Sequence, residues 1–409
     1  MSFDQADPLA HARERFSLPE STVYLDGNSL GAMPTATAFA VGKTITQEWG
    51  RDLIGSWNSA DWVNLPTRVA AKLAPLLGAH ATEVLIADST SINIFKLLAG
   101  VLMLPEIVAN AKRRVIISER ENFPTDLYIA EGINALLGNR YQLRLVAKSE
   151  LVNAIDDTTA AALITHIDYR TGQMHDMAHL NRIAHAAGTN IVWDLSHSAG
   201  AVALTLNEDH ARFAIGCGYK YLNGGPGAPG YLYVAREFQP RLSTPLSGWF
   251  GHEAPFTFGP TYTPADNITK FSCGTPSVLA IVALGVGLDT FEHFKMADIR
   301  KKSLALSDLF LTLMDTHCDA FGVSCVSPRE HATRGSQLSF SHPNAYALMR
   351  AIIDRGVVGD FRQPNLIRFG FTPLYTRYVD CWDAVMALRD VLATNRWRDE
   401  KYQQRLTVT

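Results

Sequence analysis

Lys220 is the residue of this sequence whose type and position most directly suggest chemistry. It comes just after the apolar run Ala214-Ile-Gly-Cys-Gly and before the turn-forming Asn223-Gly-Gly-Pro-Gly. A lysine amine partly removed from water at the end of a buried strand can act as a nucleophile and form a Schiff base. The flanking residues Tyr219 and Tyr221 favour this interpretation over that of a solvated surface lysine.

An aspartate and a histidine follow another apolar run, Ile191-Val-Trp, as Asp194 and His197. An aspartate that ends a buried strand lies at the carboxyl edge of the sheet, where α/β proteins bind ligands. There it could keep a pyridine nitrogen protonated, and His197 could hydrogen-bond it or lie against the ring. Taken alone, a helix cap or turn would explain Asp194 equally well, and a core position would explain His197.

Hydroxyl groups form a third group in Asp88-Ser-Thr90-Ser91, between a strand-like and a helix-like stretch. Free amides and hydroxyls at a helix N-terminus can bind a phosphate, although ordinary N-caps have the same sequence. Phe123-Pro-Thr-Asp126 repeats this arrangement and adds an aromatic ring that could stack on a planar ligand. The groups together predict a phosphate site, a ring platform, a pyridinium partner and a reactive lysine along one sheet.

The elements that position these residues alternate between strands and helices, which predicts an α/β fold with a mostly parallel sheet covered on both faces. The expected strands are 84–87, 114–117, 142–146, 160–165, 190–194, 214–217 and 231–234, and the expected helices are 92–103, 126–137 and 177–187.

The pattern changes after Thr275 to longer helices, expected at 276–294, 299–316 and 379–392, with strands at 337–340 and 366–369. We therefore expect a large domain over residues 61–285 and a smaller α+β domain over 286–409. The N-terminal segment, residues 1–60, is expected to pack with the small domain.

Composition excludes several classes of protein. The 409 residues carry 37 basic and 40 acidic side chains, a balance that argues against a nucleic-acid-binding surface. The longest uncharged apolar run, residues 278–288, is too short to cross a bilayer, and charged residues near the start leave no signal core. The five cysteines form no CxxC pair, so we expect a cytoplasmic protein without disulfides.

Two familiar motifs are absent or misplaced. The segment Gly225-Pro-Gly-Ala-Pro-Gly230 has the spacing of a dinucleotide fingerprint, but it precedes a strand and its two prolines remove amide donors. The 13 histidines form no H-E-x-x-H or similar spacing, so no metal is expected.

At the level of motifs the sequence resembles the kynureninase family, within the fold type I enzymes that use pyridoxal 5'-phosphate (PLP). The matching stretches run through nearly the whole chain: Leu25-Asp-Gly-Asn-Ser-Leu-Gly31, Phe123-Pro-Thr-Asp126, Trp193-Asp-Leu-Ser-His197, Gly218-Tyr-Lys-Tyr-Leu-Asn223, Gly248-Trp-Phe-Gly-His252 and Ile367-Arg-Phe-Gly. The resemblance implies a seven-stranded large domain, a homodimer, and hydrolysis of the Cβ–Cγ bond of L-kynurenine to anthranilate and L-alanine. The resemblance implies a place in tryptophan degradation and leaves a role in NAD biosynthesis open.

The resemblance also implies roles for individual residues. Lys220 would hold the cofactor and act as the catalytic base, and Tyr219 would relay protons. Arg368 would bind the substrate carboxylate, with Ser29 and Trp57 also contacting the substrate. The implied cofactor-binding residues are Thr90, Ser91, Phe123, Asp126, Thr165, Asp194, His197, Tyr219, Lys220, Trp249 and Thr275, of which Trp249 and Thr275 would come from the partner subunit.

One departure from the family pattern bears on the substrate. Members that prefer the 3-hydroxylated substrate carry histidine and asparagine at the positions that match Trp57 and Thr275. The resemblance therefore predicts that this chain prefers L-kynurenine.

Two other functions remain open on the sequence alone. One is another enzyme of the same fold, a cysteine desulfurase or a class V aminotransferase, for which Cys325 and Cys381 are the C-terminal candidate nucleophiles. The other is a ligand sensor joined to a DNA reader, although the first sixty residues contain no basic helix-turn-helix pattern.

Overall fold

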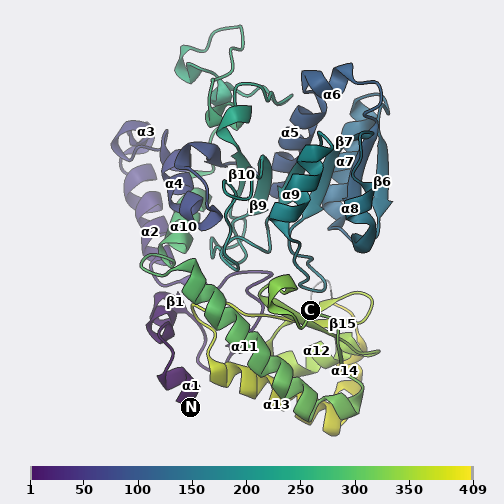
Figure 1. Cartoon of the computed structure of the whole chain (residues 1–409). Coiled ribbons are helices and arrows are strands. Elements are labelled where there is room, and N and C mark those ends of the chain that lie inside the picture. Colours follow the sequence, from purple (N-terminus) through teal and green to yellow (C-terminus); the bar gives the residue numbers. More distant parts are fainter. Residues whose placement is uncertain (1, 407–409) are drawn as a thin grey trace.

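A seven-stranded sheet forms the centre of the upper half of the molecule in Figure 1, a computed structural model that describes residues 2–406. The strand order is β4-β10-β9-β8-β7-β5-β6, and β10 runs antiparallel to both of its neighbours while the other pairs are parallel. The strands are β4 (Val84–Ile86), β5 (Val115–Glu119), β6 (Gln142–Val146), β7 (Thr159–Thr165), β8 (Asn190–Asp194), β9 (Phe213–Cys217) and β10 (Gly230–Val234). The predicted α/β class with a mostly parallel sheet is confirmed.

Helices cover both faces of this sheet because most strand residues are apolar, and every strand except the edge strand β6 is buried along its length. Alternate strand residues belong to two separate apolar clusters, one on each face. One face packs against α4 (Leu65–Leu77), α8 (Leu151–Ala154), α9 (Met177–Ala186) and α10 (Val278–Asp289). The other packs against α5 (Thr90–Leu102), α6 (Pro105–Ala109) and α7 (Pro124–Leu136).

A smaller α+β unit forms the lower half in Figure 1. Its antiparallel sheet has the order β11-β12-β15-β14 and packs against three helices around its own apolar cluster. The strands are β11 (Ser324–Cys325), β12 (Gln337–Ser341), β14 (Asp360–Arg362) and β15 (Leu366–Gly370). The helices are α11 (Met296–His317), α12 (Ala345–Ile353) and α13 (Tyr378–Ala393), followed by the short α14 (Glu400–Gln403).

The helix expected over 276–294 is shorter than predicted and ends at Asp289. The residues after it form hydrogen-bonded turns, and His293 has a left-handed backbone conformation with φ of 72° that an α-helix does not accommodate. The other expected helices and strands lie within three residues of their predicted ends.

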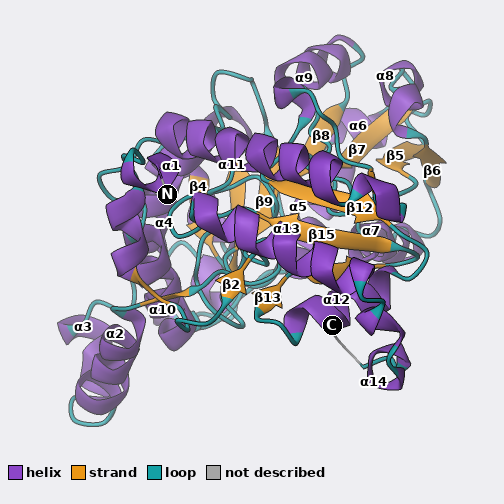
Figure 2. Ribbon diagram, turned by 90° about the horizontal axis from the view of Figure 1, so that it is seen from below, coloured by secondary structure: helices purple, strands orange, loops and turns teal. Residues whose placement is uncertain are grey.

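The N-terminal segment contacts both halves. After α1 (Ser2–Gln5), strand β1 (Phe16–Ser17) pairs with β3 (Met33–Pro34), and β2 (Val23–Tyr24) pairs in parallel with β13 (Val357–Val358) of the small unit. Next come α2 (Thr37–Lys43), a π-helical turn (Thr44–Trp49) and α3 (Ser56–Ser59), which project from the body of the molecule (Figure 2). The proposed boundary at residue 285 falls inside α10, so the division into three segments stays a prediction.

No helix within residues 2–406 is long and apolar enough to cross a bilayer.

Candidate active site

The carboxyl ends of the parallel strands place the predicted residues at one edge of the central sheet. Thr165 ends β7 and pairs in register with Asp194, which ends β8, while Lys220 follows the end of β9 by three residues. This edge faces the small unit, since side chains from β12 and β15 hydrogen-bond to residues beyond β7 and β8. The sheet thus delivers its polar side chains to the junction between the two halves, as expected for α/β proteins.

Lys220 lies against His197, with Nζ 2.9 Å from the ring Nε2. The histidine is 4% exposed, and burial together with the nearby Lys220 cation holds its pKa well below the usual range. A neutral imidazole can therefore accept a hydrogen bond from the lysine amine. The sequence prediction that Lys220 and His197 belong to one site is in accord with this contact.

Two carboxyl groups, those of Asp194 and Asp126, share the region with Lys220. Burial raises the pKa of both, and each carboxyl also interacts electrostatically with the Lys220 amine. The Asp194 Oδ1 accepts the Ser196 backbone N–H at 2.7 Å, and the Thr165 hydroxyl donates to Asp126 Oδ2 at 3.4 Å. Because burial penalises an isolated negative charge, this pair favours a cationic partner placed beside it.

Two aromatic residues flank this cluster. The ring centroid of Tyr219 lies 5.7 Å from Lys220 Nζ, and burial together with the neighbouring Cys217 thiol raises the pKa of the tyrosine. Phe123 precedes α7, is 40% exposed, and contacts Tyr169 edge to face with centroids 5.3 Å apart. Its open face leaves it able to stack on a planar ligand.

The N-terminus of α5 carries the hydroxyl groups that were predicted to bind an anion. Thr90 and Ser91 are its first two residues, and Ser89 is the N-cap, accepting the Ile92 N–H. Gly230 at the start of β10 passes so closely that a Cβ there would lie 3.1 Å from the Thr90 nitrogen. Gly230 also pairs with Cys217, so the helix N-terminus lies beside the strand end that leads to Lys220.

Arg368 is buried on β15 and is already paired. Its Nε donates to Asp360 Oδ1 at 2.8 Å, and its Nη2 donates to the Ser29 hydroxyl at 2.9 Å and to the second Asp360 oxygen. Burial alone would raise the pKa of Asp360, but Arg368 and Arg362 hold it below its usual range. Ser29 and Arg368, which the sequence analysis assigned to the substrate, are therefore brought together around Asp360.

Trp57 and Trp249 lie in a separate group of aromatic rings. Trp57 contacts Phe250 and Phe256 with centroids 6.3 and 6.2 Å apart, and Trp249 contacts the same two rings at 5.0 and 5.6 Å. Phe250 in turn lines a small cavity of about 50 Å³ together with the exposed Thr275. The structure therefore places Trp57, Trp249 and Thr275 around Phe250.

Sequence reasoning missed Gln337, Asp360 and Arg362, which all contact predicted residues. Gln337 Oε1 lies 3.1 Å from His197 Nδ1, and Arg362 Nη2 lies 2.6 Å from Asp360 Oδ2. The available signal was a polar residue at the start of a strand, since Gln337 begins β12 and Asp360 begins β14 of the small unit.

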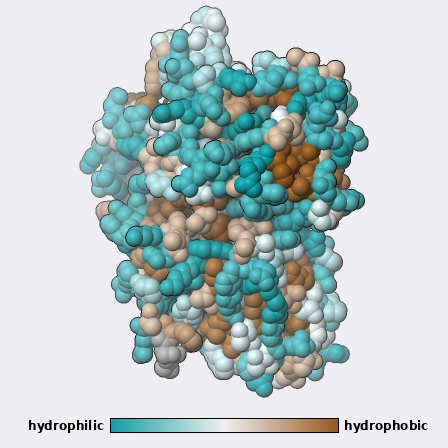
Figure 3. Space-filling model, in the orientation of Figure 1, coloured by the Kyte–Doolittle hydropathy of each residue, from teal (hydrophilic) through white to brown (hydrophobic). Residues whose placement is uncertain are grey.

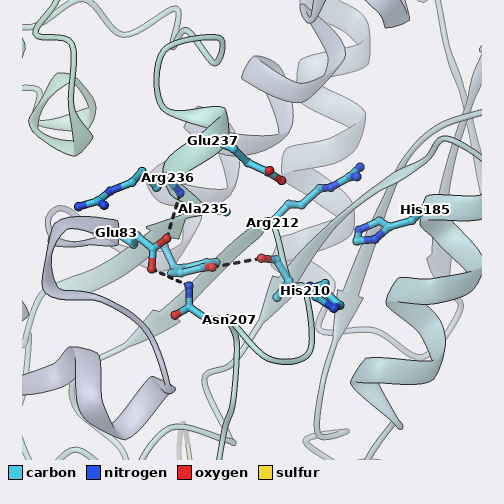
Figure 4. Close-up of a pocket in the computed structure, with 10 residues that line it drawn as sticks. Glu83, His185, Asn207, His210, Arg212, Ala235, Arg236 and Glu237 are labelled. Carbon is cyan, nitrogen blue, oxygen red and sulfur yellow. Dashed lines mark hydrogen bonds between the residues drawn. The ribbon is translucent and has the colours of Figure 1, made fainter.

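A different cavity, of about 550 Å³, lies at the opposite edge of the central sheet (Figure 4). Its lining includes Glu83, just before β4, Arg212, just before β9, and Ala235, just after β10. The Glu83 carboxylate is occupied by hydrogen bonds from Asn207 Nδ2 and the Arg236 backbone N–H. None of the predicted site residues line this cavity, and no group of three metal-ligating side chains occurs among residues 2–406.

Sequence comparisons relate the chain to kynureninases over its whole length. It is 51% identical over 411 residues to a kynureninase of Burkholderia mallei and 48% identical over 410 residues to one of Pseudomonas fluorescens, covering 100% of this chain and 98% of each relative. Residues 299–388 match the model of the kynureninase C-terminal domain.

Solved structures of similar fold include an enzyme with a PLP cofactor. A cysteine desulfurase from Thermococcus onnurineus aligns with a TM-score of 0.79 at 18% identity, covering 94% of this chain and 98% of that chain. A C-DES variant with glycine linked covalently to its PLP cofactor aligns with a TM-score of 0.80 at 14% identity, covering 92% and 99%. At these identities the similarity concerns the fold alone, whereas the full-length sequence matches place the chain in the kynureninase family.

Proposed function

We propose that this chain is a PLP-dependent hydrolase that converts L-kynurenine and water to anthranilate and L-alanine by cleaving the Cβ–Cγ bond. Family membership supports the reaction. The observation that carries the assignment to this site is the contact of Lys220 Nζ with a buried neutral His197, beside the Asp194 carboxyl.

The described residues fit PLP by their chemistry. The α5 N-terminus offers free amides and the Thr90 and Ser91 hydroxyls to a phosphate, and Gly230 keeps this approach open where a Cβ would crowd it. The Asp194 carboxyl, whose pKa burial raises even with the Lys220 amine nearby, suits a pyridinium nitrogen. Phe123 exposes a ring face, and Lys220 supplies the amine that attaches an aldehyde covalently.

Bound PLP supplies an aldehyde that forms imines with amines and a ring that withdraws electrons from the substrate α-carbon. Lys220 Nζ would hold and move the proton at this carbon, since a neutral His197 beside it accepts a hydrogen bond rather than competing as a cation. Tyr219, whose ring centroid lies 5.7 Å from Lys220 Nζ, would relay protons during the addition of water to the γ-carbonyl. Arg368 and Ser29 would hold the substrate carboxylate in place of, or beside, Asp360.

Covalent labelling tests the assignment of Lys220. The full-length chain is loaded with PLP and reduced with borohydride, and the label is then located by peptide mapping. We expect it on the peptide that contains Tyr219, Lys220 and Tyr221. The Lys220→Ala variant should still bind PLP but release no anthranilate from L-kynurenine, measured by its fluorescence, and a label on Lys270 would contradict the assignment.

The cysteine desulfurase alternative is not favoured by the thiols that it requires. Cys325 is half-buried with Sγ 3.5 Å from the Ser327 carbonyl, and burial raises its pKa. Burial likewise raises the pKa of Cys381, which is fully enclosed. A nucleophilic cysteine needs an exposed and easily ionised thiol, which neither residue offers.

A homodimer is part of the proposal. Exposed apolar residues support it on the projecting segment from α2 to α3, residues 37–59, which we call the N-terminal arm. On this arm Phe39, Trp49, Leu53 and Ile54 are 58–79% exposed, and Trp49 also lines a largely apolar hollow of about 460 Å³ together with the start of α10. The face in Figure 3 is mostly hydrophilic, with apolar side chains in a few separate areas. Apolar surface on a projecting segment is typical of an interface, here with a second copy of this chain.

The oligomeric state tests this interface. Ile54→Glu should shift the mass measured by light scattering from that of two chains toward that of one. The substitution puts a charge into the apolar surface that the dimer would bury. Leu136→Glu, at a 68% exposed position on α7, is the matched control and should leave the mass unchanged. An Ile54→Glu variant that keeps the mass of two chains would contradict this placement of the interface.

We also propose that the protein works in the cytoplasm. All five cysteines lie in the described part of the chain and are unpaired. Unpaired cysteines are typical of proteins from a reducing compartment.

A further inference from the structure

Gln337 connects the small unit to the reactive lysine through one histidine. Its side chain is 1% exposed at the start of β12, and Oε1 lies 3.1 Å from His197 Nδ1. On the other side of the same ring, His197 Nε2 lies 2.9 Å from Lys220 Nζ. The three side chains therefore form one continuous chain of hydrogen bonds.

The direction of these hydrogen bonds follows from the amide of Gln337. Its Nε2 lies 2.9 Å from the Tyr169 carbonyl oxygen and 3.3 Å from that of Asp168, and both oxygens can only accept. The amide nitrogen must therefore donate to the loop, which leaves Oε1, an acceptor, facing His197. Nδ1 of the ring must then carry the proton and donate it.

The assignment of the proton to Nδ1 also determines whether the other ring nitrogen, Nε2, is protonated. In a neutral imidazole only one nitrogen carries a proton, and burial keeps His197 neutral by lowering its pKa. With Nδ1 protonated, Nε2 presents a lone pair to Lys220 Nζ, which donates. The opposite tautomer would set two N–H donors against each other at 2.9 Å.

We propose that Gln337 is a positioning residue for the reaction: it fixes His197 in the Nδ1-protonated tautomer, so that Nε2 orients the Lys220 amine. The orientation is relayed from the backbone of residues 168 and 169, because the loop holds Gln337 and Gln337 holds His197. Gly172 allows this close packing, since a Cβ there would lie 2.9 Å from the Gln337 Cγ. The Tyr169 carbonyl also accepts from Arg368, so one oxygen anchors both Gln337 and the arginine.

Nitrogen-15 NMR of the histidine-labelled, full-length holoenzyme tests the tautomer directly. The wild type should show the His197 resonances of a ring protonated at Nδ1 and unprotonated at Nε2, assigned by their absence in His197→Asn. In Gln337→Met, which has a side chain of similar size without the amide, the ring should become mixed or protonated at Nε2. An unchanged tautomer in this variant would overturn the proposal.

Two further variants guard against a loss of folding or a general packing effect. Gln337→Glu keeps an acceptor for Nδ1–H, and its second oxygen, when protonated, can donate to the Tyr169 carbonyl as the amide does, so Nδ1 should stay protonated. A Gln337→Glu ring without a proton on Nδ1 would overturn the proposal even if Gln337→Met does not fold. Gln239→Met is the matched control, because Gln239 is a buried glutamine whose amide also donates to two carbonyls, those of Thr82 and Val234, away from His197.

The kinetic part of the test rests on the proposed function. With L-kynurenine, Gln337→Met should lower kcat about 10–100-fold with little change in KM, the loss typical of a residue that orients a reactive group through another. Gln337→Glu should recover part of the rate, and Gln239→Met should retain the wild-type value. Equal losses of kcat in Gln337→Met and Gln239→Met would mean a structural effect and overturn the positioning role. A wild type inactive on L-kynurenine would refute the proposed function and leave the tautomer measurement intact.

Discussion

The Asp194 carboxyl combines burial with a satisfied backbone contact, which makes it suitable for a conservative test. Oδ1 accepts the Ser196 backbone N–H, and an asparagine at this position can keep that acceptor while losing the negative charge. Such a substitution separates the charge of the side chain from its structural contact.

Asp194→Asn should therefore fold normally and bind PLP, yet lose about 10²–10³-fold in kcat, the usual cost of removing a group that stabilises developing charge. Anthranilate release measures the loss, and circular dichroism checks the fold. Asp209→Asn is the control, because the partly buried Asp209 contacts Thr205 away from the site. Activity within threefold or so of the wild type in Asp194→Asn would contradict its role.

The choice between substrates with and without a hydroxyl on the aromatic ring is a second property that single residues can set. Trp57 contacts Phe250 in the aromatic group, and Thr275 lines the cavity of about 50 Å³ together with Phe250. If Trp57 of one chain and Thr275 of its partner line the substrate site, as the resemblance implies, a substrate ring would meet apolar surface and one short hydroxyl.

We expect a preference for L-kynurenine over 3-hydroxy-L-kynurenine of about tenfold or more in kcat/KM, since an unpaired buried hydroxyl costs roughly 1–3 kcal/mol. The double variant Trp57→His with Thr275→Asn should narrow or reverse this ratio. Equal kcat/KM for the two substrates in the wild type would show that these positions do not set specificity.

Strands of the large unit were predictable because most of their residues are apolar, and its helices because apolar residues recur along one face. The runs ending at Asp194 and Cys217 therefore predicted both the strands and the edge where the polar side chains emerge. Gln337 and Asp360 could not be predicted as site residues, because their partners belong to other parts of the chain. His197 is 140 residues from Gln337, and only the packing of the two units brings them together.

The approach of β10 to α5 gives a prediction at the scale of elements. In Gly230→Ala the new Cβ would lie about 3.0–3.1 Å from Gly216 O, Asn93 Nδ2 and Thr90 N, two of which are backbone atoms. The helix N-terminus must shift, so we expect the Kd for PLP to rise about 5- to 30-fold, as overpacking of 1–2 kcal/mol implies. Titration followed by absorbance measures the Kd.

Gly132→Ala in α7 is the matched control. A Cβ there meets nothing within 4 Å, so the variant should keep the wild-type Kd and gain roughly 0.5–1 kcal/mol of stability. A wild-type Kd in Gly230→Ala would mean that α5 does not hold the phosphate.

Acid stability is a property of the whole molecule to which one buried histidine contributes measurably. His166 is enclosed, with its two ring nitrogens at 2.9 Å from the Ser198 hydroxyl and 3.2 Å from the His175 carbonyl. Burial lowers its pKa from 6.5 to about 3, with the nearby His175 contributing. Between these values the unfolded chain binds a proton that the folded chain does not, so stability falls as pH decreases below 6.5.

His166→Gln should be less stable than the wild type by about 1–3 kcal/mol at pH 7, because two buried hydrogen bonds are disturbed. The gap should shrink by roughly 1.4 kcal/mol per pH unit below pH 6.5, since glutamine has no proton to gain. Urea unfolding of both proteins at several pH values measures the difference, in which the other titrating groups cancel. A gap that stays constant between pH 5 and pH 8 would contradict a neutral, buried His166.

The parallel pairing of β2 with β13 has a consequence for the order in which this protein folds during translation. Residues 23 and 24 emerge early, but Val357 and Val358, their partners in the sheet, are translated more than three hundred residues later. The seven strands of the central sheet all lie between Val84 and Val234, so they can assemble co-translationally while the leading segment still waits. Ser29 meets Asp360 and Arg368 only after these residues are translated, and no nascent chain shorter than 368 residues can bring the three side chains together.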